Sequence, residues 1–99
     1  MELRDLARVL RSKNAGPGTL TLDIMLPNEA AMARVLAAPW LTPAHIARLY
    51  GVAEASVRIV PFAPAHAVKI VLPREAAGAP GDRDVYGAQA HAPLLDLPV

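Results

Sequence analysis

The chain has 99 residues, which suits a single domain over residues 1–99, and its 54% of hydrophobic residues would leave apolar surface that favours a partner. Its 10 basic and 9 acidic residues give a net charge of +1, which argues against a nucleic-acid-binding protein, and no apolar run is long enough to cross a membrane. Cysteine is absent, which excludes disulfides and thiolate zinc sites, and the charged first residues lack the apolar core of a signal peptide, so we expect a cytoplasmic protein.

The first third of the chain predicts a short element, a loop and a strand. Apolar residues at positions 3, 6, 9 and 10 fit one or two helical turns, although a short strand fits as well. Residues 11–18 are polar and contain a proline between two glycines, so we expect a loop there. Residues 19–26 have apolar side chains at every second position, which predicts a strand with one buried face.

Two helices are predicted for the middle of the chain. Asn28 can cap the first helix, over residues 29–38, before a proline ends it. Thr42, which is followed by a proline, is a strong start signal for the second helix, and Gly51 is its expected end. Trp40 lies between the two helices, where we expect it to anchor their packing.

The last part of the chain predicts a hairpin, a loop and an apolar tail. Residues 56–62 and 66–72 alternate in polarity and are joined by a short turn, as in a hairpin. Residues 74–83 are rich in glycine and proline, so we expect a loop, followed by a short helix from Ala88 and a tail that packs on the domain. This order indicates an α+β fold, an antiparallel sheet with helices on one face, and a ferredoxin-like variant that the first segment could complete.

The polar loop is the first candidate site, because its side chains suit an anion. Arg11 offers a planar fork and Lys13 a point charge, and both bind carboxylate or phosphate. Ser12 and Asn14 add neutral donors, and Gly16 lets backbone amides approach a ligand. The glycine spacing matches neither a Walker motif nor a dinucleotide fingerprint. The alternative is an ordinary connection whose polar groups cap the strand and face solvent.

A second candidate site follows the hairpin. An acid, a phenol, an amide and an imidazole occur close together there, on Asp84, Tyr86, Gln89 and His91. His91 could act as a general base near neutral pH, and Lys69 and Arg74, which flank this region, could meet an anion. The alternative is that Asp84 caps a turn, Tyr86 is buried and His91 and Lys69 face solvent. We expect this segment to meet the first loop in space, with Arg11 or Lys13 facing Asp84.

Other constellations have less support. His45, His66 and His91 are too far apart in sequence to form a metal-ligand pair, so we expect neither a metal nor a cofactor. Ser12, His91 and Asp23 could be combined into a Ser-His-Asp triad, but no nucleophile elbow supports one.

The segment Arg11-Ser12-Lys13-Asn14-Ala15-Gly16-Pro17 resembles the signature of a family of small uncharacterised bacterial proteins, a domain of unknown function. Three further pieces agree, namely Thr21-Leu22-Asp23-Ile24, Val68-Lys69-Ile70 with Pro73-Arg74, and Asp84-Val85-Tyr86-Gly87-Ala88-Gln89. Such proteins are often encoded beside, or fused to, large proteins similar to the acyclic terpene utilisation family, which end in a small ferredoxin-like domain. The resemblance therefore implies a subunit or accessory domain of an enzyme that acts on organic acids or acyl-CoA esters.

Three functions remain open at this point. The first is a small subunit that completes the site of a larger enzyme with its anion-binding loop. The second is a self-contained lyase or hydratase in which Lys13 or His91 is the base. The third is a non-catalytic oligomerisation or binding module that uses the strand face with Thr21, Asp23 and Met25.

Overall fold

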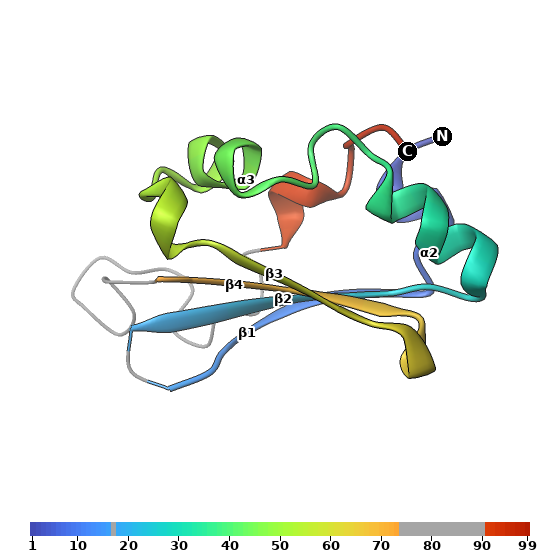
Figure 1. Cartoon of the computed structure of the whole chain (residues 1–99), viewed down its shortest axis with the longest axis horizontal. Coiled ribbons are helices and arrows are strands. Elements are labelled where there is room, and N and C mark those ends of the chain that lie inside the picture. Colours follow the sequence, from blue (N-terminus) through green and yellow to red (C-terminus); the bar gives the residue numbers. More distant parts are fainter. Residues whose placement is uncertain (17, 74–90) are drawn as a thin grey trace.

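The computed structural model describes residues 1–16, 18–73 and 91–99, and it contains a four-stranded antiparallel sheet in the order β1-β2-β4-β3. The strands are β1 (Val9–Asn14), β2 (Thr19–Met25), β3 (Arg58–Phe62) and β4 (Ala67–Pro73). The α-helices are α1 (Leu3–Leu6), α2 (Glu29–Leu36) and α3 (Pro43–Tyr50), and the short 3₁₀ helices are η1 (Glu54–Ser56), η2 (Ala63–Ala65) and η3 (Ala92–Leu94). Helices α2 and α3 and both chain ends lie on one side of the sheet (Figure 1). The predicted α+β class, with helices on one face of an antiparallel sheet, is confirmed.

The sheet is built around a split β-α-β unit. Strands β2 and β3 run parallel, and β4 lies between them and is antiparallel to both. Strand β1 precedes this unit and pairs with β2 from Val9 opposite Met25 to Asn14 opposite Leu20. The edge of the sheet is therefore formed mainly by residues of the predicted loop, whereas residues 3–6 of the predicted first element form the helix α1. The ferredoxin-like assignment itself is not confirmed, because that pattern is β-α-β-β-α-β, whereas here β1 and β2 form a hairpin and both α2 and α3 follow β2.

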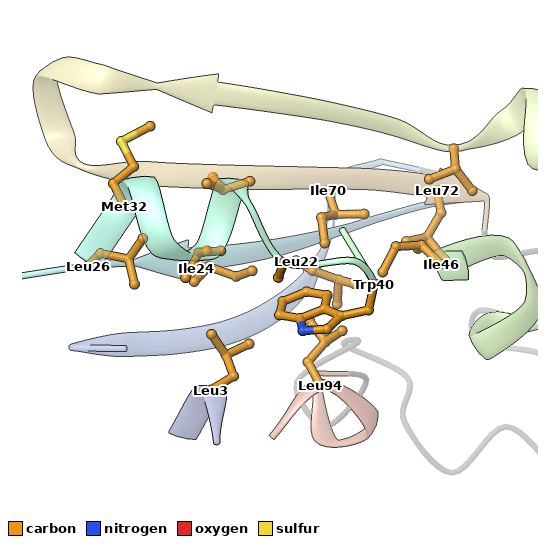
Figure 2. Close-up of a cluster of buried hydrophobic side chains, with 14 of the residues drawn as sticks. Leu3, Leu22, Ile24, Leu26, Met32, Trp40, Ile46, Ile70, Leu72 and Leu94 are labelled. Carbon is orange, nitrogen blue, oxygen red and sulfur yellow. The ribbon is translucent and has the colours of Figure 1, made fainter. Parts of the chain in front are cut away.

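The core lies between the sheet and the helices. The apolar side chains of β2 and β4 that face the helices are at most 3% exposed, and they are Leu20, Leu22, Ile24, Val68, Ile70 and Leu72. Leu22 lies opposite Ile70 in the register, and both pack near Trp40 from the segment between α2 and α3 (Figure 2). The strand predicted over 19–26 and the predicted hairpin are therefore confirmed, because alternation places one apolar row of each strand in this core.

The helix ends follow the predicted capping signals. The Asn28 side chain accepts a hydrogen bond from the backbone N–H of Ala31 at 2.9 Å, and Thr42 accepts one from His45 at 3.2 Å. Gly51 ends α3 with a φ of +69°, a left-handed conformation that favours glycine. In the described parts of the chain, every helix is too short or too polar to cross a bilayer.

Removing the first of these caps should destabilise the domain measurably. We expect Asn28→Ala to lower the free energy of unfolding by about 1 kcal/mol, because the Ala31 N–H loses its side-chain acceptor. Asn28→Asp keeps an acceptor at the same place and should retain most of the stability. Urea denaturation of the three proteins would measure both effects, and equal losses in the two variants would contradict this role of the side chain.

The chain ends are tied to the core and to each other. Leu94 is fully buried, and the backbone N–H of Leu3 donates to the carbonyl of Leu97 at 2.8 Å. Trp40 Nε1–H donates to the carbonyl of Pro98 at 2.6 Å. The prediction that the apolar tail packs on the domain is confirmed. The predicted loop over 74–83 and the predicted helix from Ala88 lie outside the described residues.

The loop predicted over residues 11–18 is wrong in its first half. Residues 11–14 belong to β1, in which Leu10 and Ser12 face the helix side and alternate with Arg11 and Lys13. The strand forms in spite of its polar composition because β2 offers a full ladder of backbone partners. The connection between the strands begins only at position 15, after the end of β1, and within it Gly16 has a φ of +108°.

Candidate anion-binding site

Three of the predicted site residues lie on the face of the sheet opposite α2 and α3, which we call the open face. The register places Arg11 opposite Asp23, and Asp23 opposite Lys69, so these side chains form one row across β1, β2 and β4. Lys13 lies two positions along β1 on the same face, opposite Thr21. Cross-strand neighbours on one face are close enough to interact, so the fold gathers three cations around one carboxylate.

A pocket of about 390 Å³ lies on the open face, and Arg11, Lys13, Asp23 and Lys69 all line it. The charged groups leave a surplus of two positive charges. Within the part of the chain that the structure describes, no carboxylate pairs with the ammonium group of Lys13 or Lys69. Exposed cations that lack a carboxylate partner can bind carboxylate or phosphate groups, so the pocket is suited to an organic anion.

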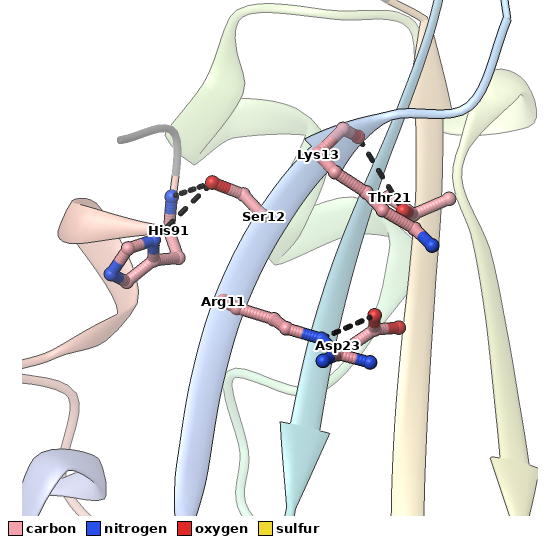
Figure 3. Close-up of polar contacts among 6 residues, drawn as sticks. All are labelled: Arg11, Ser12, Lys13, Thr21, Asp23 and His91. Atoms are coloured by element: carbon pink, nitrogen blue, oxygen red, sulfur yellow. Dashed lines mark hydrogen bonds and ion pairs between the residues drawn. The ribbon is translucent and has the colours of Figure 1, made fainter. Parts of the chain in front are cut away.

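Asp23 organises the row of charges from a nearly buried position. Asp23 is only 8% exposed, and its Oδ2 lies 3.3 Å from Nε of Arg11 (Figure 3). This contact uses one edge of the guanidinium group and restrains the Arg11 side chain over the pocket. Local sequence patterns do not place Asp23 in the anion site, because only the strand register brings it between Arg11 and Lys69.

Asp23 should therefore contribute more to stability than a surface carboxylate. We expect Asp23→Asn to lower the free energy of unfolding by about 1–2 kcal/mol, because Arg11 loses its ion-pair partner and the neighbouring cations of the row lose the one negative charge among them. The loss should shrink in high salt, which screens repulsion between exposed charges.

The matched control is Asp96→Asn, which removes the exposed ion pair between Arg4 and Asp96. Pairs at such exposed positions contribute about 0–1 kcal/mol, so this variant should remain close to the parent protein. Thermal denaturation at low and high ionic strength would compare the two, and equal, salt-independent losses would contradict the assigned role of Asp23.

Ser12 and His91 meet on the other side of the sheet. Ser12 is 7% exposed and points away from Arg11 and Lys13 towards the C-terminal segment (Figure 3). Its Oγ accepts a hydrogen bond from the backbone N–H of His91 at 3.1 Å and lies 3.2 Å from His91 Nδ1. This contact attaches the start of the C-terminal segment to the edge strand.

Comparison with known proteins gives a family for this chain. Residues 3–98 match a family model described as "Domain of unknown function (DUF4387)". The chain belongs to the DUF4387 family. No curated protein and no solved structure matches it. The expectation of an uncharacterised domain is therefore confirmed.

The two candidate bases of this DUF4387 domain lie on opposite faces. Lys13 lines the pocket on the open face, whereas His91 lies on the helix side next to Ser12. The Ser12-His91-Asp23 triad is also not assembled, because Asp23 shares the open face with Arg11.

Burial raises the pKa of the Tyr50 phenol on α3, so this group stays neutral around physiological pH.

Among the described residues, two further predicted site residues do not line the pocket. Asn14 shares the helix-side face of β1 with Ser12, and Gly16 lies in the connection beyond the strand. Four further candidates, Arg74, Asp84, Tyr86 and Gln89, lie outside the described residues, as does the predicted meeting of residues 84–89 with the first segment. Among the residues that are described, no group of side chains is arranged to hold a metal ion.

Proposed function

We propose that this DUF4387 domain is a small subunit or accessory domain of a larger enzyme, to which it supplies an anion-binding site. Its ligands would be organic acids or acyl-CoA esters. The observation that carries the proposal is the gathering of Arg11, Lys13 and Lys69 around one pocket on the open face. The guanidinium fork and the two ammonium groups can bind a carboxylate or a phosphate at several points.

The position of the pocket supports a role within a complex. It lies on a sheet face that no described helix covers, and its apolar lining residues Val60 and Phe62 are exposed. Enzyme sites usually exclude water, and here a second protein would have to cover the pocket. The resemblance noted above supplies the candidate, a large protein similar to the acyclic terpene utilisation family.

Co-expression with such a large protein tests the proposal. We expect a stable complex in size-exclusion chromatography with light scattering, and turnover of organic acids or acyl-CoA esters that needs both chains. The large protein alone and this chain alone are the matched controls. Failure of the two chains to associate, or equal turnover without this chain, would refute the subunit role.

Two other functions would produce different results. A self-contained lyase or hydratase would convert these substrates as the purified chain, with Lys13 or His91 as the base. The placement of these two side chains on opposite faces argues against a reaction that uses both. An oligomerisation module is expected from the sequence to use the strand face with Thr21, Asp23 and Met25, but Thr21 and Asp23 are buried, at 5% and 8% exposure. Self-association would therefore have to use the exposed apolar side chains of the same face, such as Phe62, and light scattering of the chain alone would detect it.

A further inference from the structure

Polarity on the open face changes along the strand direction. The central row across the sheet is Arg11, Asp23, Lys69 and Val60, and Lys13 lies in the neighbouring row at one end. The neighbouring row at the other end is entirely apolar and consists of Val9, Met25, Ala67 and Phe62. We call this second set the apolar row. Rows two residues apart are about 7 Å apart along a strand, so the cations and the apolar row are within reach of one small molecule.

The apolar row is incompletely covered by the protein itself. Phe62, which belongs to the apolar row, is 57% exposed. Val60, two positions away on β3 in the central row, is 40% exposed, and both side chains line the pocket together with the cations. A small hydrophilic anion would neutralise the cations but would leave these side chains in water. An anion with an apolar chain would satisfy both parts of the pocket, because burial of apolar surface is favourable.

We propose that the pocket binds an amphipathic organic anion, with its carboxylate or phosphate between Arg11, Lys13 and Lys69 and its hydrocarbon chain on the apolar row. This inference rests on the proposed function and specifies the class of ligand. The charged group would come from a free acid or from the phosphates of a CoA ester. Both sources combine a negative group with an apolar chain, which are joined directly in a free acid and through the pantetheine arm in a CoA ester.

Calorimetric titration of the 99-residue chain, and of its complex with the large protein, tests the inference. The probes are acetate, butanoate, hexanoate and octanoate, with octanol as the uncharged control. Affinity should rise by up to roughly fourfold for each methylene group that becomes buried. Octanol should bind at least tenfold more weakly than octanoate. Equal affinities for acetate and octanoate, equal affinities for octanoate and octanol, or no binding of octanoate to either preparation would overturn the inference.

Coenzyme A and octanoyl-CoA distinguish the two sources of the charged head. Octanoyl-CoA that binds more tightly than octanoate, while coenzyme A alone binds weakly, assigns the site to acyl-CoA esters. Octanoate that binds more tightly than octanoyl-CoA assigns it to free acids. Either result supports an amphipathic anion. Coenzyme A that binds as tightly as octanoyl-CoA would count against a site for the hydrocarbon chain.

Phe62→Ser separates the hydrocarbon contact from the charge contact. We expect this variant to bind octanoate about tenfold more weakly and to bind acetate as before. Leu49→Ser is the matched control, because Leu49 is also an exposed large apolar residue, on α3 away from the pocket. It should leave both affinities unchanged. An unaltered octanoate affinity in Phe62→Ser would overturn the inference. The inference would also be overturned if the parent chain forms a dimer and Phe62→Ser is a monomer, because a second copy of the chain would then occupy the apolar row.

The inference and the proposed function fail in different ways. If only the inference fails, binding still depends on Lys13 and Lys69 but does not depend on chain length. If the proposed anion site fails, substitution of the two lysines leaves every affinity unchanged. A titration series on the Lys13→Ala/Lys69→Ala variant therefore distinguishes the two outcomes.

Discussion

Lys13→Ala should weaken the binding of octanoate or octanoyl-CoA by roughly tenfold to a hundredfold, which corresponds to about 1.5–3 kcal/mol for a hydrogen bond to a charged group. Lys13 is exposed on the edge strand β1, and its side chain lines the pocket without entering the core. The free energy of unfolding should therefore change by no more than about 0.5 kcal/mol. Titration calorimetry and thermal melting of the same preparation measure the two quantities.

A cation on the opposite side of the sheet provides the control. Arg48 is exposed in the last turn of α3, so Arg48→Ala removes the same charge without touching the pocket. This variant should bind as the parent does. Activity of the reconstituted complex should follow the affinity, falling in Lys13→Ala and not in Arg48→Ala. Equal effects of the two substitutions would show that only net charge matters, and a large fall in melting temperature would make Lys13 structural.

Trp40→Ala should lower the free energy of unfolding by about 3–5 kcal/mol, the range for removing a large buried aromatic side chain. Trp40 is 2% exposed and packs between the sheet and the C-terminal segment (Figure 2). The substitution also leaves the carbonyl of Pro98 without the indole N–H that donates to it at 2.6 Å. Urea denaturation would measure the loss, and hydrogen exchange would locate the first effect in residues 91–99.

Trp40→Phe separates packing from the hydrogen bond. Phenylalanine keeps most of the apolar volume but has no N–H, so this variant should lose clearly less than Trp40→Ala, with about 1–3 kcal/mol attributable to the unsatisfied carbonyl and the smaller ring. A loss below about 1 kcal/mol in Trp40→Ala would contradict the role of this residue as a core anchor.

Local signals in the sequence were sufficient for most of the scaffold. Capping by Asn28 and by Thr42 depends on side chains within four residues of the helix start, so both were predictable. The alternation along β2 likewise needs only neighbouring residues. The helix-side core could be assigned from that alternation, because a strand with one apolar face must bury it.

The candidate site depends on contacts that local patterns do not contain. Residues 11–14 have the composition of a loop, and only their pairing with β2 makes them a strand. That change moves Ser12 to the helix side and leaves Arg11 and Lys13 on the open face, so a predicted single loop divides into two environments. Phe62 joins the pocket from a strand that is 49 positions further along the chain than Lys13, and periodicity within one segment does not reveal such a contact.

The pairing of the two chain ends gives the molecule a natural point of attachment. The backbone N–H of Val99 donates to the carbonyl of Met1 at 3.0 Å, and both ends lie on the helix side of the sheet (Figure 1). A tether at either end therefore starts from the same place and leaves from the layer behind the pocket. If the domain is immobilised on a biosensor chip through such a tether, its cations and its apolar row will face the solution.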